Sequence, residues 1–187
     1  MSICAERAAA DGLDACDFTF VLVEAPTAPP NAFQTRSSDG KPVITVNSSL
    51  LAQLRDDDEL ATVLSHEAAH HVAGHIDRMN DRTSPDAFLP GDAGGYTAQS
   101  DGRARGRALE LEADWIGAFI AERSGYDPAH GANIFERAAT KQGAKTSRTS
   151  SHPDPSQRLE VVAAAVAEIG RQRSAGLTPR PESAPAL

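Results

Sequence analysis

Two histidines four residues apart, His66 and His70, lie in a segment that has the features of a long helix. Three aspartates at residues 56–58 precede this segment, and acidic side chains at a helix start bind its free backbone N–H groups and favour its dipole. Residues four apart on a helix differ by about 40° around its axis, so both imidazoles can point at one cation. The rest of the chain must therefore fold around this helix face.

The segments before this helix predict a small sheet. Residues 18–24 and residues 42–47 are rich in β-branched or aromatic side chains, and each run has the length of a strand. A loop at residues 25–30 contains three prolines, and the turn sequence at residues 37–40 joins residues 31–36 to the last run as a hairpin. We expect an antiparallel sheet in which the first hairpin strand lies at an edge.

The remaining segments predict a mostly helical body, so the fold class is α+β. Apolar spacing, capping acids and first-turn prolines predict four further helices, at residues 48–55, 101–123, 128–142 and 155–173. Residues 79–100 are rich in glycine and proline and have no sustained period, which predicts a long loop that acts as a lid. We expect one domain at residues 1–173 and a disordered tail at residues 174–187.

The composition disfavours two classes of partner. The chain has a formal net charge of -8 and scattered Lys and Arg residues, so binding to a nucleic acid is not expected. No run approaches the about 20 apolar residues of a membrane span, and the first ten residues lack the pattern of a secretory signal. We expect no transmembrane segment, and the oligomeric state stays open.

The state of the two cysteines, Cys4 and Cys16, depends on the compartment. They are close enough in sequence to close a small loop under oxidising conditions. The alternative is a pair of free thiols, and both interpretations stand at this point. If an upstream signal has been removed, we expect the bacterial envelope or periplasm; otherwise the protein is cytoplasmic.

Two histidines are not enough for a catalytic zinc site, which uses three protein ligands and one open position. Glu67 points about 100° further round the helix than His66, which suits a general base beside the metal better than a ligand. His75 follows His70 by five residues, which differs from the metzincin spacing, and its ring is expected to point away. His71 also faces elsewhere, so we interpret His71 and His75 as structural or surface histidines.

The second long helix offers a third ligand. Glu110 and Asp114 are four residues apart and share a helix face. Glu110 can therefore bind zinc while Asp114 accepts the outer N–H of a ligand histidine. Glu112, about 200° from Glu110 around the axis, is interpreted as part of an ordinary acidic face.

Four motifs follow one another along the chain: His66-Glu67-Ala-Ala-His70, Glu110-Leu-Glu-Ala-Asp114, Gly125-Tyr-Asp-Pro128 and Ser151-His-Pro-Asp-Pro-Ser-Gln-Arg158. In this order they resemble the gluzincin peptidases of the HtpX and BepA type, classified as peptidase family M48, which includes the CAAX prenyl proteases. The resemblance covers about residues 18–170. The chain resembles the soluble, minimal branch, because it lacks the membrane spans of the HtpX and prenyl-protease branches.

The resemblance implies a zincin-like metallopeptidase domain with the HExxH helix at a cleft. It assigns one Zn²⁺ per chain to His66, His70 and Glu110, in agreement with the spacing argument. It also assigns the general base to Glu67 and support of a ligand to Asp114.

Three further assignments rest on the resemblance alone. It implies that His152 lies near the metal, where it stabilises an oxyanion or occupies the open position in a resting state. It implies that Arg158 anchors the site electrostatically. The sequence Asn31-Ala32-Phe33 resembles the family's edge-strand signature, so an extended substrate is expected to pair there.

The expected function is that of a zinc metalloendopeptidase, a hydrolase that acts on peptides or unfolded proteins in protein quality control. The alternative is a latent or inactive zinc-bearing module that binds misfolded proteins like a chaperone. The general base Glu67 argues for the enzyme, because a structural zinc site has no use for it.

Overall fold

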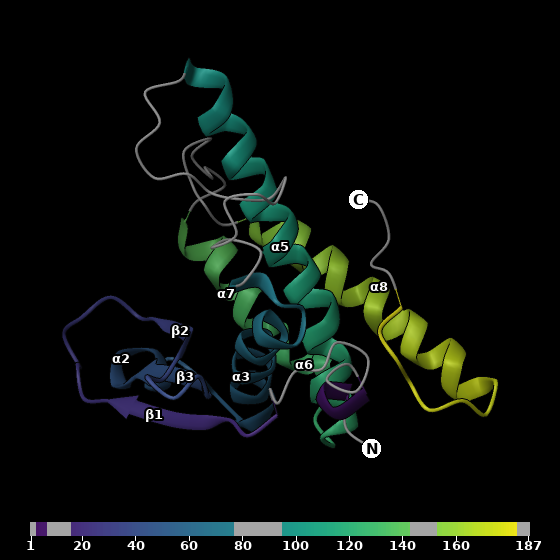
Figure 1. Ribbon diagram of the computed structural model, residues 1–187. Coiled ribbons are helices and arrows are strands. Elements are labelled where there is room, and N and C mark those ends of the chain that lie inside the picture. The colour runs from purple at the N-terminus through teal and green to yellow at the C-terminus, as the bar shows by residue number, and fades with distance from the viewer. Residues whose placement is uncertain (1–2, 7–15, 77–94, 143–152, 183–187) are drawn as a thin grey trace.

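The computed structural model describes residues 3–6, 16–76, 95–142 and 153–182. In chain order the elements are β1 (Thr19–Val23), β2 (Ala32–Arg36), β3 (Pro42–Asn47), α2 (Ser48–Leu51), α3 (Asp57–Val72), α5 (Gly95–Arg123), α6 (Pro128–Gly131), α7 (Asn133–Gln142) and α8 (Pro155–Ser174). Figure 1 shows the sheet at one side of a body made of helices. The predicted α+β architecture is confirmed.

The sheet is mixed, with β3 between β1 and β2. β3 pairs with β2 in antiparallel and with β1 in parallel orientation, so that Phe20 and Gln34 are both partners of Ile44. The prediction of an antiparallel sheet is therefore wrong for one of the two pairings. After β1, the proline-rich loop at residues 25–30 leads to β2, which does not pair with β1. The second strand of the hairpin, β3, lies between them and pairs with both. Two reversals of direction leave β3 parallel to β1.

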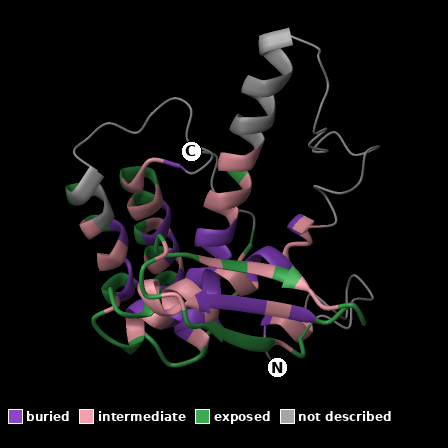
Figure 2. Ribbon diagram, turned by 90° about the vertical axis from the view of Figure 1, so that its left-hand side faces the viewer, coloured by how far each residue is buried: buried purple, intermediate pink, exposed green. Residues whose placement is uncertain are grey.

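The three strands differ in burial. Figure 2 shows β3 buried between two more exposed strands, and Ile44 at its centre is fully buried. All five residues of β1 are exposed, whereas β2 alternates between half-buried and exposed residues and contacts α3. β2 is thus the edge strand that packs against α3.

Helices α3, α5 and α8 form the hydrophobic core beside the sheet. Phe119 and Ile116 of α5 and Val161 of α8 are fully buried in it. Close approach of α3 and α5 depends on Gly117, where an added Cβ would lie 3.1 Å from the backbone nitrogen of His66. The missing side chain lets α5 approach α3 at the turn that carries His66.

The second long helix is longer than predicted. α5 begins at Gly95, before the expected start at Asp101, so the end of the predicted loop is helical. The rest of that loop, with most of the proposed lid, lies outside the described residues. The lid therefore stays a prediction.

The predicted helix at residues 128–142 is divided into α6 and α7. α6 presses against α3 where a Cβ on Gly131 would lie 2.0 Å from Oγ1 of Thr62 and 2.4 Å from the carbonyl oxygen of Asp58. Contact this close requires glycine. α6 ends at Gly131, with Ala132 as its C-cap, and α7 begins at Asn133.

The C-terminal segment departs from the prediction of a disordered tail at residues 174–187. Gln172 donates its side-chain amide to the carbonyl of Arg180 at 3.0 Å and accepts the backbone N–H of Arg180 at 2.7 Å. The indole of Trp115 donates to the carbonyl of Glu182 at 3.0 Å. This part of the tail therefore folds back against α5 and α8, and the last part of the tail, residues 183–187, lies outside the described residues.

A disulfide joins Cys4 to Cys16. It ties the short helical segment at residues 3–6 to the start of β1, and Ile3 in that segment enters the hydrophobic core. Of the two states that the sequence left open, the structure has the bonded one. Among the described helices, none has the length and apolar character needed to cross a membrane.

Candidate active site

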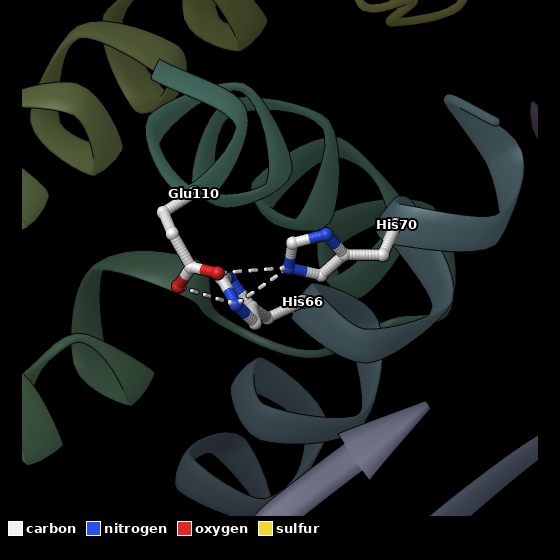
Figure 3. Close-up of side chains that lie close together, drawn as sticks. All are labelled: His66, His70 and Glu110. Atoms are coloured by element: carbon white, nitrogen blue, oxygen red, sulfur yellow. Dashed lines mark hydrogen bonds and ion pairs between the residues drawn. The ribbon is translucent and has the colours of Figure 1, made fainter. Parts of the chain in front are cut away.

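Three side chains converge between α3 and α5 (Figure 3). Nε2 of His66 lies 3.2 Å from Nε2 of His70, and the carboxylate oxygens of Glu110 lie 3.6 and 3.5 Å from these two atoms. Each residue offers one ligand atom, and the three atoms lie within 4.8 Å of one another. The structure therefore brings together the three residues that the sequence predicts as metal ligands. We call His66, His70 and Glu110 the ligand cluster.

The helices explain this convergence. Asp56 caps α3 by accepting the backbone N–H of Glu59 at 3.0 Å, so the helix runs unbroken past both histidines. Both imidazoles are buried on the face toward α5. Glu110 is one turn before Asp114 on α5, and this places its carboxylate opposite the two rings.

The outer nitrogen of His66 is held by an anchored carboxylate. Nδ1 of His66 lies 2.8 Å from Oδ1 of Asp114, whose side chain is only 1% exposed. Arg158 of α8 donates two hydrogen bonds to the same carboxylate, from Nε at 2.7 Å and from Nη2 at 2.6 Å. Its guanidinium also lies 3.9 Å above the ring of Phe135. The structure thus gives Asp114 and Arg158 contacts that fit the supporting roles predicted for them.

These charges determine the protonation of the two histidines. Burial alone would lower the pKa of His66, but the charge and hydrogen bond of Asp114 raise it to about 9. Burial, with the charge of His66, lowers the pKa of His70 to about 3. Burial opposes ionisation of Asp114, but Arg158 and His66 hold its pKa below the usual range. Without a cation, the histidine pair therefore carries one positive charge, on His66, and a metal ion that bound its Nε2 would release the extra proton.

His75 lies inside the site, against the prediction that its ring points away. It is fully buried, and its Nδ1 lies 2.8 Å from Nδ1 of His70. Glu112, predicted to belong to an ordinary acidic face, places a carboxylate oxygen 3.4 Å from Nε2 of His75. Helical spacing misplaced His75 because α3 ends at Val72 and the chain turns at Gly74, whose φ is 67°. The glycine after the helix was the signal of this turn.

His71 faces away from the ligand cluster, as predicted. Its buried ring lies edge-on to Phe18 with the centroids 5.7 Å apart.

Glu67 is half-buried on α3 and is not a member of the ligand cluster. Its charge reaches Arg158: burial would lower the pKa of Arg158, but Asp114, Glu110 and Glu67 raise it. Glu67 directly follows His66 on α3, so it is next to one member of the ligand cluster without belonging to the cluster.

Two further predictions for the site concern His152 and the edge strand. His152 is outside the described residues, so its place near the metal stays a prediction. Asn31, Ala32 and Phe33 run into the edge strand β2, where the backbone N–H of Asn31 donates to Oδ1 of Asn47 at 3.1 Å. Phe33 is 47% exposed. This strand contacts α3, the helix that carries both histidines.

A second group of potential ligands, Asp56, Asp58 and His130, lies at the start of α3. Its side chains have other roles there. Asp56 caps the helix and pairs with His130 at 2.9 Å, and Asp58 accepts the backbone N–H of Asp127 at 2.9 Å. This group is largely exposed, so the buried cluster is the candidate active site.

An α+β fold with two histidines and a glutamate converging from adjacent helices, and a second glutamate inside the HExxH sequence, defines the site of a metallopeptidase. Comparison with known proteins identifies the family. The chain matches Peptidase family M48 over residues 1–89 and 95–166. It belongs to that family.

Three similar proteins share one name. The chain is 32% identical over 166 residues to the mitochondrial metalloendopeptidase OMA1 of Saccharomyces cerevisiae, with 79% of this chain and 47% of that protein covered. It is 30% identical over 132 residues to a protein of the same name from Arabidopsis thaliana, covering 65% and 27%. For the Schizosaccharomyces pombe protein the identity is 27% over 168 residues, covering 82% and 48%. The chain thus spans at most about half the length of these relatives.

These comparisons confirm the predicted family, and through it the predicted class of enzyme, a metalloendopeptidase. The HtpX and BepA branch and the bacterial origin stay predictions.

Proposed function

We propose that the protein is a zinc-dependent endopeptidase that cuts extended segments of unfolded proteins. The observation that carries the proposal is the buried convergence of His66, His70 and Glu110 from two helices. Both histidines present Nε2 to the cluster and have a partner at Nδ1. A site whose ligands are oriented in this way is prepared for a cation.

The donor set suits zinc. Two imidazole nitrogens and one carboxylate are typical zinc ligands, whereas calcium and magnesium prefer oxygen ligands. Catalytic zinc sites use three protein ligands, which is the number in this cluster among the described residues. A bound zinc ion would polarise the scissile carbonyl and bring the pKa of a coordinated water to about 7.

The proton transfers of the reaction would depend on side chains of the protein itself. Glu67 is half-buried beside the ligands and is the candidate to accept a proton from the attacking water and pass it to the leaving amine. Asp114 and Arg158 keep the ring of His66 in a fixed orientation. His152 is proposed to stabilise the oxyanion.

Substrate binding is proposed at the edge strand β2. Its outer edge has no partner strand among the described strands, and it lies against the helix with the ligands. An extended peptide could add to this edge by main-chain hydrogen bonds, which do not depend on the peptide's sequence. Recognition of backbone alone suits unfolded proteins and a role in protein quality control.

The compartment is proposed to be oxidising, such as the bacterial envelope. The disulfide between Cys4 and Cys16 supports this, because such bonds persist mainly outside the reducing cytosol.

Casein turnover, measured together with metal content, tests the proposal. We expect one zinc per chain, loss of cleavage after treatment with a chelator, and recovery when zinc is restored. A protein that holds zinc and binds unfolded chains but cleaves none would contradict the proposal. That result would support the zinc-bearing binding module instead.

A further inference from the structure

His70 has a buried partner on the side of its ring that faces away from the ligand cluster. Nδ1 of His75 lies 2.8 Å from Nδ1 of His70, and the two rings are nearly perpendicular at 77° with centroids 4.8 Å apart. On its other side, Nε2 of His75 faces the carboxylate of Glu112 at 3.4 Å. We propose that His75 and Glu112 are positioning residues for His70 as a metal ligand, an inference that rests on the metal site of the proposed function.

The hydrogen bonds have one consistent direction. Nε2 of His70 faces His66 and Glu110, so it is the nitrogen that would bind the metal. A metal-binding nitrogen carries no proton, so the proton of a neutral His70 lies on Nδ1 and is donated to Nδ1 of His75. The proton of His75 then lies on Nε2 and points at Glu112. His70 thus donates a hydrogen bond to His75, and His75 donates one to the carboxylate of Glu112. The hydrogen bond from His75 to Glu112 is long, at 3.4 Å.

The two ligand histidines are therefore supported in parallel ways. The outer nitrogen of His66 meets the carboxylate of Asp114 directly, at 2.8 Å. The outer nitrogen of His70 reaches a carboxylate through the ring of His75. Partners of this kind fix the tautomer and the ring orientation of a ligand, and their loss typically costs about 10–100-fold in metal affinity. We expect a loss of that order when His75 no longer accepts the hydrogen bond.

The end of α3 explains how the backbone places His75 beside His70. α3 ends at Val72, and Ala73 closes its last turn by donating to the carbonyl of Ala69 at 2.8 Å. Gly74 then adopts a φ of 67°, a conformation that other side chains rarely take. The turn brings His75 back over the end of α3, where its ring is fully buried and has little freedom to rotate.

Zinc affinity, measured by competition with a chromophoric chelator, tests the assignment. His75→Phe keeps a ring of similar size but removes both nitrogens, and we expect zinc to bind about 10–100-fold more weakly. His75→Asn restores an acceptor close to the position of Nδ1 and should recover part of the loss. His71→Phe is the matched control, because it replaces an adjacent buried histidine that faces Phe18, and we expect it to keep the affinity.

A second pair of variants covers the case in which His75→Phe does not fold. The side chain of Glu112 is 31% exposed, so Glu112→Ala should fold, and we expect it to weaken zinc binding while Glu112→Gln, which keeps an acceptor oxygen, stays nearer to wild type. Cobalt substituted for zinc gives a visible spectrum that reports ligand geometry. This spectrum should change in His75→Phe and Glu112→Ala but not in His71→Phe.

The outcomes separate this assignment from the proposed function. Wild-type zinc affinity and an unchanged cobalt spectrum in every folded variant at His75 and Glu112 would overturn the assignment alone. A wild-type protein that binds zinc but cleaves no casein would overturn the proposed function, while the affinities still decide the roles of His75 and Glu112. A wild-type protein that binds no zinc would overturn both.

Discussion

Removal of the Arg158 guanidinium should destabilise the fold through the carboxylate that it anchors. Asp114 is almost completely buried and receives two hydrogen bonds from Arg158. Breaking a buried ion pair from one side costs about 3–5 kcal/mol, because it leaves an uncompensated charge. His66 still contacts the carboxylate at 2.8 Å after the change, which favours the lower end. For Arg158→Leu we therefore expect a loss of about 3 kcal/mol, since leucine keeps some of the packing over Phe135.

Urea unfolding of the metal-free protein, followed by far-UV circular dichroism, measures this loss. The matched control is Arg171→Leu on the same helix, whose side chain is 75% exposed and pairs with Glu168, and we expect a change within about 0.5 kcal/mol. In the double variant Arg158→Leu/Asp114→Asn the buried charge is gone, so much of the stability should return. If Arg158→Leu lost less than about 1 kcal/mol, the value of an exposed ion pair, the reasoning would be refuted.

Three further predictions concern regions outside the ligand cluster. Gly131→Ala should prevent α6 from docking and greatly lower the melting temperature, because its methyl group would lie 2.4 Å from a backbone oxygen of α3; an unchanged melting temperature would contradict this packing. The hydrogen bond to Asp56 raises the pKa of His130 above its ordinary value of 6.5. The backbone N–H of Glu59, and after it His130, lower the pKa of Asp56 below its ordinary value of 3.8. The ion pair therefore stabilises the fold fully between pH 3.8 and pH 6.5, the ordinary pKa values of the two groups. The stability difference between wild type and His130→Ala should therefore shrink as the pH rises through the folded pKa of His130 and as it falls through that of Asp56; a pH-independent difference would exclude this linkage. Replacement of Cys4 and Cys16 by serine should lower the free energy of unfolding by about 2–3 kcal/mol through the lost loop constraint, and equal urea midpoints for the two proteins would show that the bond is dispensable.

The convergence of His66, His70 and Glu110 could be predicted because each part of it depends on local helix geometry. The spacing of His66 and His70, and that of Glu110 and Asp114, fixes which side chains share a face once the two segments are helical. Capping acids marked where α3, α6 and α8 begin. Local rules of this kind are sufficient for a site that is built from two regular helices.

Other features depend on contacts that local sequence does not encode. The direction of β1 relative to β3 follows from which hairpin strand docks beside it, a choice made by tertiary packing. The place of His75 follows from a turn after the helix, so a helical projection gave the wrong direction for its ring. Arg158 meets Asp114 only because α8 packs on α5, and the family resemblance, not spacing, pointed to it.

Cleavage of casein by the zinc-loaded variant Glu67→Gln, compared with wild type at equal zinc content, tests the central claim most directly. The amide keeps the size of the side chain and leaves His66, His70 and Glu110 to hold the metal, so zinc should stay bound. Turnover should fall by at least about 10²–10⁴-fold, because the amide cannot accept the proton of the attacking water. Glu110→Ala is the contrasting variant, since it removes a ligand and should lose zinc and activity together. Near-normal turnover in Glu67→Gln, or loss of its zinc, would contradict the role of Glu67 as the general base of a metallopeptidase.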